Sequence, residues 1–100
     1  MSVLDKVKFD ADGYMEDSNA WTPEIAEAIA KREEVTLTER SWVVINYARN
    51  EFKVKGEAPT LRNITKNTDV DTKELYSLFP GGPGKMAAKV AGLHKPTGCI

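Results

Sequence analysis

The sequence predicts a mainly α-helical fold: a small orthogonal bundle containing a helix-turn-helix-like pair, preceded by a β-hairpin and followed by a flexible C-terminal arm. Helix start and stop signals recur along the chain, the connections between them are short, and the last eight residues show no periodicity. A chain of 100 residues can bury one modest core. We therefore expect a single domain, with the bundle in residues 1–92 and the arm in residues 93–100.

The N-terminal segment, residues 3–16, alternates weakly between apolar and polar side chains. Phe9 precedes and Tyr14 follows an Asp12-Gly13 pair, which tolerates the positive φ of a tight hairpin turn. Because two strands alone are marginally stable, we expect this hairpin to pack on the helices.

Two capped helices should follow. Thr22-Pro23 supplies a capping hydroxyl and a proline at the first helical position, so a helix should start there and fade near Glu33. Thr38 should cap a longer helix that stops before Gly56, a residue suited to a C-terminal cap. The residues of these helices expected to supply core are Ile25, Ala26, Ala28, Ile29, Trp42, Ile45, Tyr47, Ala48 and Phe52.

A pair of short helices around a turn comes next. Thr60 should open the first of them, which runs to about Thr68. Asp71 and Glu74 have the spacing of a capping box for the second. This arrangement is that of a helix-turn-helix.

A Pro-Gly-Gly-Pro run at residues 80–83 should end that pair. A last helical piece over residues 84–91 is then expected to be closed by Gly92. The overlapping segment at residues 81–85 (GGPGK) is not expected to form a phosphate-binding loop, because the full Gly-x-x-x-x-Gly-Lys-Ser/Thr pattern and a preceding strand are both missing. The residues of the last piece expected to face inward are Met86, Ala87 and Val90.

The composition limits the classes of function. The charges nearly cancel, with 14 basic and 15 acidic residues, so the chain has no global field for nucleic acid or a membrane. Residues 1–55 hold 8 basic and 11 acidic side chains, whereas residues 56–100 hold 6 and 4. One cysteine cannot form an internal disulfide, and the sequence has no signal peptide or apolar run of membrane-spanning length. We expect a cytoplasmic protein.

The sole cysteine, Cys99, is the strongest candidate for chemistry. A thiolate attacks sulfur or carbon electrophiles, and eight extended residues span at most about 26–29 Å, enough to carry a thiol into a partner's cleft. His94 is either a base for Cys99 or, more simply, a solvated residue. The alternative for Cys99 itself is an inert cysteine.

Three segments near the C-terminus form a recognisable pattern: residues 78–85 (LFPGGPGK), 89–93 (KVAGL) and 95–100 (KPTGCI). They resemble the C-terminal signature of the DsrC/TusE family, which includes the gamma subunit of dissimilatory sulfite reductase. Similar residues continue upstream, at Phe9, Gly13, Tyr14, Trp21, Trp42 and the APTLR of residues 58–62. The resemblance covers nearly the whole chain, and Lys-Pro-Thr-Gly-Cys is its most specific part.

The resemblance implies a sulfur carrier. The family's penultimate cysteine corresponds to Cys99, which would hold a persulfide during sulfur transfer. The implied donor is a TusBCD- or DsrEFH-like protein, and the implied acceptor is a tRNA 2-thiouridylase, an oxidative sulfur pathway or a sulfite reductase-like enzyme. Such a sulfurtransferase lacks a complete active site of its own, and we expect no cofactor and no metal.

One departure narrows the implied chemistry. Family members that serve sulfite reductase have a second cysteine eleven positions before the penultimate one, where this chain has Ala88. A methyl group cannot replace a thiol, so a disulfide or trisulfide between two cysteines is impossible. The one-cysteine, TusE-like relay remains.

Basic residues near the arm are candidates for docking an acidic partner. They are Lys85, Lys89, Lys95 and Arg62. The alternative function is a non-redox regulatory or DNA-binding paralogue, in which Arg62, Lys66 and Lys73 of the helix-turn-helix-like pair would contact phosphates. Asp69, Asp71 and Glu74 share that segment, so its basic face is sparse for specific DNA binding.

Overall fold

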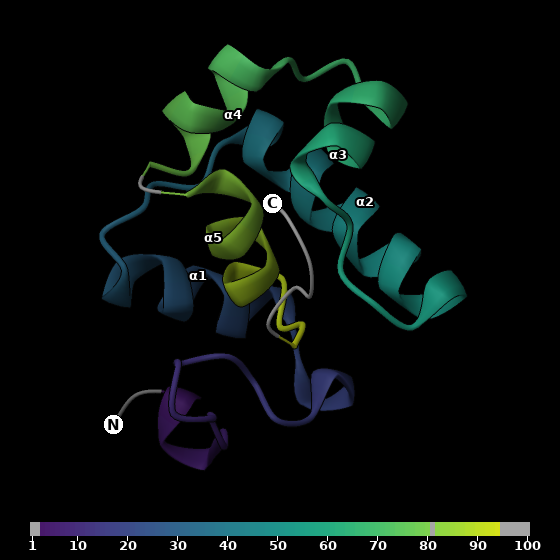
Figure 1. Ribbon diagram of the computed structural model, residues 1–100. Helices are drawn as coiled ribbons and strands as arrows, with labels where there is room; N and C mark the ends of the chain where they lie inside the picture. The colour runs from purple at the N-terminus through teal and green to yellow at the C-terminus, as the bar shows by residue number, and fades with distance from the viewer. Residues whose placement is uncertain (1–2, 81, 95–100) are drawn as a thin grey trace.

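The structure is a computed structural model that describes residues 3–80 and 82–94. Within these residues the chain forms helices and connecting loops (Figure 1). The elements in order are the 3₁₀ helices η1 (Val3–Lys6) and η2 (Ser18–Ala20) and the α-helices α1 (Pro23–Arg32), α2 (Glu39–Lys55), α3 (Leu61–Asn67), α4 (Thr72–Leu78) and α5 (Pro83–Val90).

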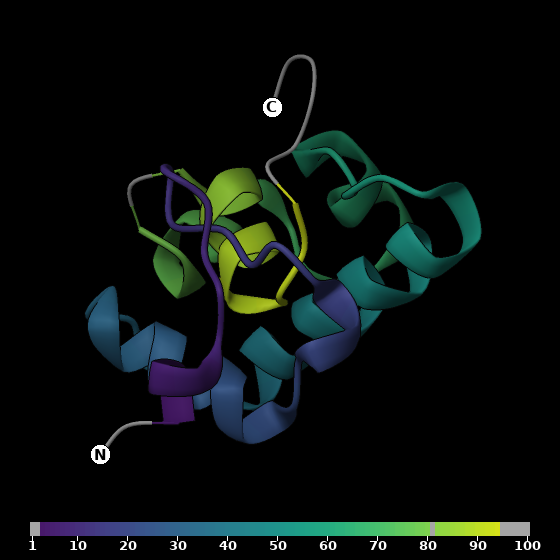
Figure 2. The same cartoon turned by 90° about the horizontal axis from the view of Figure 1, so that it is seen from below.

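Helix α5 organises the bundle. It packs against α1, α2 and α4, while α3 packs on α2 and η1 packs on α1. Figure 1 shows α5 in the middle of the molecule, and Figure 2 shows the N-terminal segment crossing beneath it. The largest fully buried side chains are Phe79, Met15, Ile29, Ile45, Ile64, Leu75, Leu93, Val44, Val70, Val90 and Ser41. None of the helices in the described part of the chain is long and apolar enough to cross a membrane.

The helix boundaries confirm the capping signals in the sequence. The Thr22 hydroxyl accepts from the amide of Ile25 at the start of α1. Thr38 and Ser41 form a reciprocal capping box on α2, and Gly56 ends that helix in the left-handed region at φ 77°. A mainly helical fold is therefore correctly predicted.

Only one of the two hydrogen bonds of the capping box predicted for α4 forms. Asp71 accepts from the amide of Glu74 at 2.8 Å. The Glu74 carboxylate, however, does not return to the cap. It accepts two hydrogen bonds from Arg40 of α2, at 2.7 and 2.9 Å, because a guanidinium is a stronger partner than a backbone amide.

The predicted N-terminal β-hairpin is wrong. No strand occurs in residues 3–80 and 82–94, and the segment contributes one antiparallel bridge, Phe9 to Met15. The turn itself forms, with Gly13 at φ 89°. The Asp10 carboxylate accepts hydrogen bonds from the backbone amides of Asp12 and Tyr14, at 2.9 and 3.0 Å. Such local bonds between a side chain and the backbone compete with the hydrogen bonds of a strand pair.

Candidate functional site

The candidate site is built around the point where α5 ends. Cys99, Lys95 and the rest of residues 95–100 lie outside the described residues. The segment that leads into them, residues 91–94, is described; we call it the root of the arm. Its geometry decides where residue 95 starts.

The root closes α5 with a Schellman motif. The amide of Gly92 donates to the carbonyl of Lys89 at 3.2 Å, and the amide of Leu93 donates to that of Ala88 at 3.0 Å. Gly92 has φ 74°, which glycine adopts without strain. Leu93, assigned from the sequence to the arm, is 1% exposed and belongs to the core. The described beginning of the predicted arm is thus packed on the bundle.

Trp21 fastens the root to the N-terminal segment. Its indole Nε1 donates to the carbonyl oxygen of Val90 at 2.9 Å. The indole also lies so close to Gly92 that a Cβ on that residue would fall 2.3 Å from Trp21 Cδ1. Glycine is therefore required at position 92 for two reasons, its positive φ and this close approach.

Arg49 of α2 also holds the root, beside Trp21. Its Nη1 donates to the carbonyl of Ala91 at 2.8 Å and its Nη2 to that of Ser18 at 3.2 Å. The guanidinium carbon stacks 4.2 Å from the centre of the Trp21 ring. Burial lowers the pKa of Arg49, and no carboxylate within the described residues forms an ion pair with it.

His94 is the last described residue. Its Nε2 lies 3.0 Å from the carbonyl oxygen of Glu16, so the geometry assigns the proton to Nε2 as donor. The ring meets Phe52 edge-on, with 5.6 Å between the ring centres. The exposed imidazole thus has backbone and aromatic contacts on the bundle.

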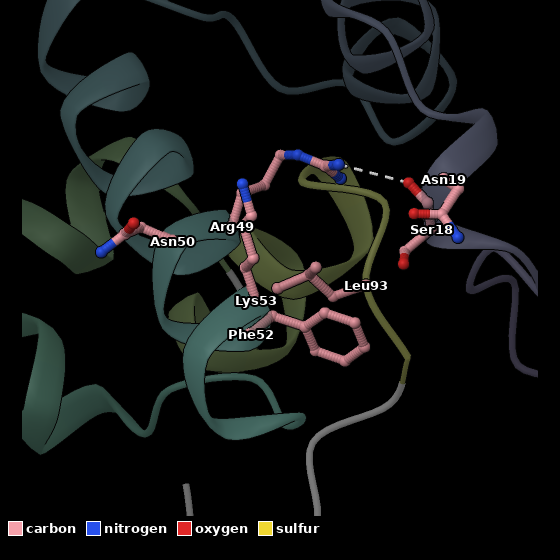
Figure 3. A pocket seen from close by; sticks show the side chains of 7 residues that line it. All are labelled: Ser18, Asn19, Arg49, Asn50, Phe52, Lys53 and Leu93. Carbon is pink, nitrogen blue, oxygen red and sulfur yellow. Dashed lines mark hydrogen bonds between the residues drawn. The ribbon is translucent and has the colours of Figure 1, made fainter.

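An open groove of about 670 Å³ lies beside the root (Figure 3). One side is formed by α2 and the other by η2 and Leu93. Its lining residues are Ser18, Asn19, Arg49, Asn50, Phe52, Lys53 and Leu93. We call it the root groove.

The predicted docking residues do not form one described cluster. Lys85 is exposed on the first turn of α5, and Arg62 is exposed on the first turn of α3. Lys89 is instead engaged within the fold: its Nζ lies 3.5 Å from Glu33 Oε1 and 5.3 Å from the centre of the Tyr14 ring.

The helix-turn-helix-like pair, α3 and α4, is held by acidic side chains. Arg40 of α2 donates to Asp69 at 2.9 Å in the connection and to Glu74 in α4. Hydrogen bonds from Arg40 lower the pKa of both carboxyls. Negative charge is thus part of what orders this segment, which does not favour phosphate contacts there.

Neither the root groove nor the role of Arg49 was predicted from the sequence. One signal was available: Ile45, Ala48, Arg49 and Phe52 share the i, i+3, i+4, i+7 spacing of one helix face. An arginine on an apolar face needs buried acceptors, which here are the carbonyls of Ala91 and Ser18. Within the described residues, no group of three or more His, Cys, Asp or Glu side chains could hold a metal ion.

These features define a small helical protein with a firmly rooted C-terminal segment. Residues 4–100 match the family described as "DsrC like protein", and the chain belongs to this family. It is 40% identical to the "Sulfurtransferase TusE" of Photorhabdus laumondii, covering 95% of this chain and 92% of that protein. It is also 40% identical to the "Sulfite reductase, dissimilatory-type subunit gamma" of Nitratidesulfovibrio vulgaris, covering 91% of this chain and 88% of that protein.

Solved structures agree with this assignment. The solution structure of Allochromatium vinosum DsrC matches with a TM-score of 0.85 and 39% identity, covering 100% of this chain and 96% of that chain. The oxidized gamma-subunit of the dissimilatory sulfite reductase from Archaeoglobus fulgidus matches with a TM-score of 0.82 and 38% identity, covering 94% of this chain and 92% of that one. The family resemblance stated from the sequence is confirmed.

Proposed function

We propose that this protein is a sulfur carrier that holds sulfane sulfur as a persulfide on Cys99 and passes it to a partner. The observation that carries the proposal is the position of the chain's one cysteine. It lies inside the segment matched to the DsrC family, which extends to residue 100. The relatives named as sulfurtransferases support the same role.

The proposed transfer is an exchange at sulfur. The Cys99 thiolate attacks the outer sulfur of a donor persulfide, forming a new S–S bond as the donor's S–S bond breaks and the donor thiolate leaves. The Cys99 persulfide then gives its outer sulfur to an acceptor thiolate and returns to a thiol. No external oxidant or reductant enters either step.

The single cysteine favours the TusE-like branch of this chemistry. Ala88 is buried on α5 and carries no thiol, so Cys99 has no partner for a disulfide within the chain. We infer a donor of the TusBCD or DsrEFH type and, as acceptor, a tRNA thiolase or a sulfite reductase-like enzyme. The carrier would act as a sulfurtransferase only together with such a partner.

The root supports this function by fixing the point from which residues 95–100 continue. Six extended residues, 95–100, reach at most about 20–22 Å from His94. A fixed origin concentrates the thiol within that radius, which favours an encounter with a docked partner.

We place this chemistry in the cytoplasm, since a reducing compartment keeps the thiol free.

Intact mass spectrometry tests the proposal. The protein is incubated with a small-molecule persulfide donor, and the wild type should gain the mass of one sulfur atom, which a reductant then removes. Cys99→Ser is the matched variant and should gain none. Equal sulfur addition to both proteins, or none to the wild type, would contradict the carrier function.

A further inference from the structure

We propose that the root groove docks an acidic peptide segment of the protein that exchanges sulfur with Cys99. This inference rests on the sulfur-carrier function proposed above. It adds a binding surface on the bundle that is separate from the thiol.

The root groove carries positive charge, although the chain as a whole does not. The protein has a formal net charge of −1, yet Arg49 and Lys53 line the groove and no described lining residue is acidic. His94 lies against Phe52, another lining residue. Positive charge collected beside a recess favours a partner of opposite sign.

Arg49 gives the groove a positive charge that no carboxylate of residues 3–80 and 82–94 neutralises in an ion pair. Arg32 pairs with Glu33, and Arg40 with Asp69 and Glu74. Among the described residues, Arg49 donates to neutral carbonyls only, although it is half-buried, and burial lowers its pKa. An incoming carboxylate would supply a counter-charge that the described residues do not provide, with a larger gain in interaction energy than at a fully solvated arginine.

The remaining lining suits a peptide. The side-chain amides of Asn19 and Asn50 form no hydrogen bond to any described residue, so each can serve a peptide backbone. Phe52 and Leu93 add apolar surface between these polar groups. Charged and amide groups around an apolar centre are typical of a protein interface.

The position links docking to transfer. Leu93 is both a wall of the groove and the residue two positions before Lys95. A partner held here lies next to the start of the segment that carries Cys99, so docking raises the effective concentration of the thiol at the partner's site. A nucleic acid fits less well, because two cations are few for a phosphate backbone.

Transfer kinetics with a persulfide-loaded TusBCD-type donor complex test the proposal. Lys53→Glu should raise the KM for the donor about tenfold with kcat nearly unchanged, and should reduce the dependence of KM on salt. Lys66→Glu is the matched control: it makes the same charge change at an exposed site on α3 and should keep the wild-type KM. Arg49→Lys, which keeps the charge, should lie closer to the wild type than Arg49→Met.

Two further measurements locate the occupant. In a ¹⁵N NMR titration with a short peptide of alternating glutamate and leucine, shifts should concentrate at Ser18, Asn19, Asn50 and Lys53. The peptide with glutamine in place of glutamate should produce much weaker shifts. Stronger competition at this site by transfer RNA than by the acidic peptide, or a dimer that buries the groove in light scattering, would overturn the proposal.

The two proposals fail separately. Loss of small-molecule persulfide loading on the wild type removes the carrier function. Normal loading together with equal KM values for Lys53→Glu and Lys66→Glu removes the docking groove alone. Groove shifts that appear when residues 95–100 are deleted would identify the chain's own C-terminal segment as the occupant and would also overturn the docking proposal.

Discussion

The indole nitrogen of Trp21 donates a 2.9 Å hydrogen bond to the carbonyl oxygen of Val90, a residue 69 positions further along the chain. This bond joins the loop before α1 to the last turn of α5. Together with the two carbonyls held by Arg49, it makes the end of α5 a junction of three segments. The root is therefore fixed by contacts that are distant in sequence.

Replacing Gly92 tests how closely this junction is packed. Gly92→Ala should lower the free energy of unfolding by about 3 kcal/mol, because it combines a left-handed backbone with a Cβ driven into Trp21. Urea denaturation measures the loss. Gly56→Ala is the control, since Gly56 has φ 77° and nothing within 4 Å of its added Cβ; it should cost about 1 kcal/mol. Equal losses at the two sites would contradict the Trp21 contact.

Removing the Arg49 guanidinium should loosen the root. Arg49→Met keeps most of the side-chain volume but removes the side-chain donor to the carbonyl of Ala91 and one of the two donors to the carbonyl of Ser18, which keeps the amide of Trp21. The expected cost is about 2 kcal/mol. Hydrogen exchange should accelerate at the amides of Gly92 and Leu93 more than in the middle of α2. Unchanged protection at those two amides would show that the root does not depend on Arg49.

Acid should weaken the link between α2 and α4. Arg40 lowers the pKa of Asp69 and Glu74 below their ordinary values of 3.8 and 4.5. Carboxyls whose pKa is lower in the folded state stabilise it fully above those ordinary values and lose the effect as pH falls through the lowered ones. Arg40→Gln should therefore be less stable than the wild type above pH 4.5, and the difference should shrink in more acidic solution.

Paired urea titrations of both proteins across the acidic range give this comparison. Added salt should reduce the difference above pH 4.5, because the three side chains remain partly exposed. A stability difference that is independent of pH would mean that Arg40 acts through packing and not through these two carboxyls.

The helices could be predicted from the sequence because their ends carry local signals. Thr22, Thr38 and Gly56 act within a few residues of themselves, and each cap forms as expected. The hairpin could not be judged in the same way. The turn at Asp12-Gly13 was correctly predicted. The sequence does not show, however, that the Asp10 carboxylate accepts hydrogen bonds from two backbone amides of the turn, so that a single bridge forms instead of a pair of strands.

The candidate site was harder to predict from the sequence than the fold, because its contacts join residues that are distant in sequence. Lys89 and Lys85 both belong to the basic half of the sequence, yet Lys89 pairs with Glu33 of α1, a contact that depends on how α1 and α5 pack. The counterparts of Arg49 lie 31 and 42 residues away. Sequence spacing within one helix reveals such a residue as unusual but does not identify its acceptors.

Placing a thiol at position 88 tests the burial of that site. The variant Ala88→Cys with Cys99→Ser carries a single cysteine at a position that is 2% exposed. It should fold with a loss of about 1 kcal/mol from overpacking and react slowly with a thiol reagent, since reaction requires local opening. Urea should restore the rate of an unprotected thiol. Fast reaction in the native state would contradict the packing of α5.

The buried methyl of Ala88 has a consequence for electron flow. A carrier with two thiols can discharge its cargo by closing a disulfide, and a cellular reductant must then reopen it. With a methyl on α5 at that place, the carrier ends each round in the oxidation state in which it began. Any reduction of the delivered sulfur must then be the work of the protein that receives it.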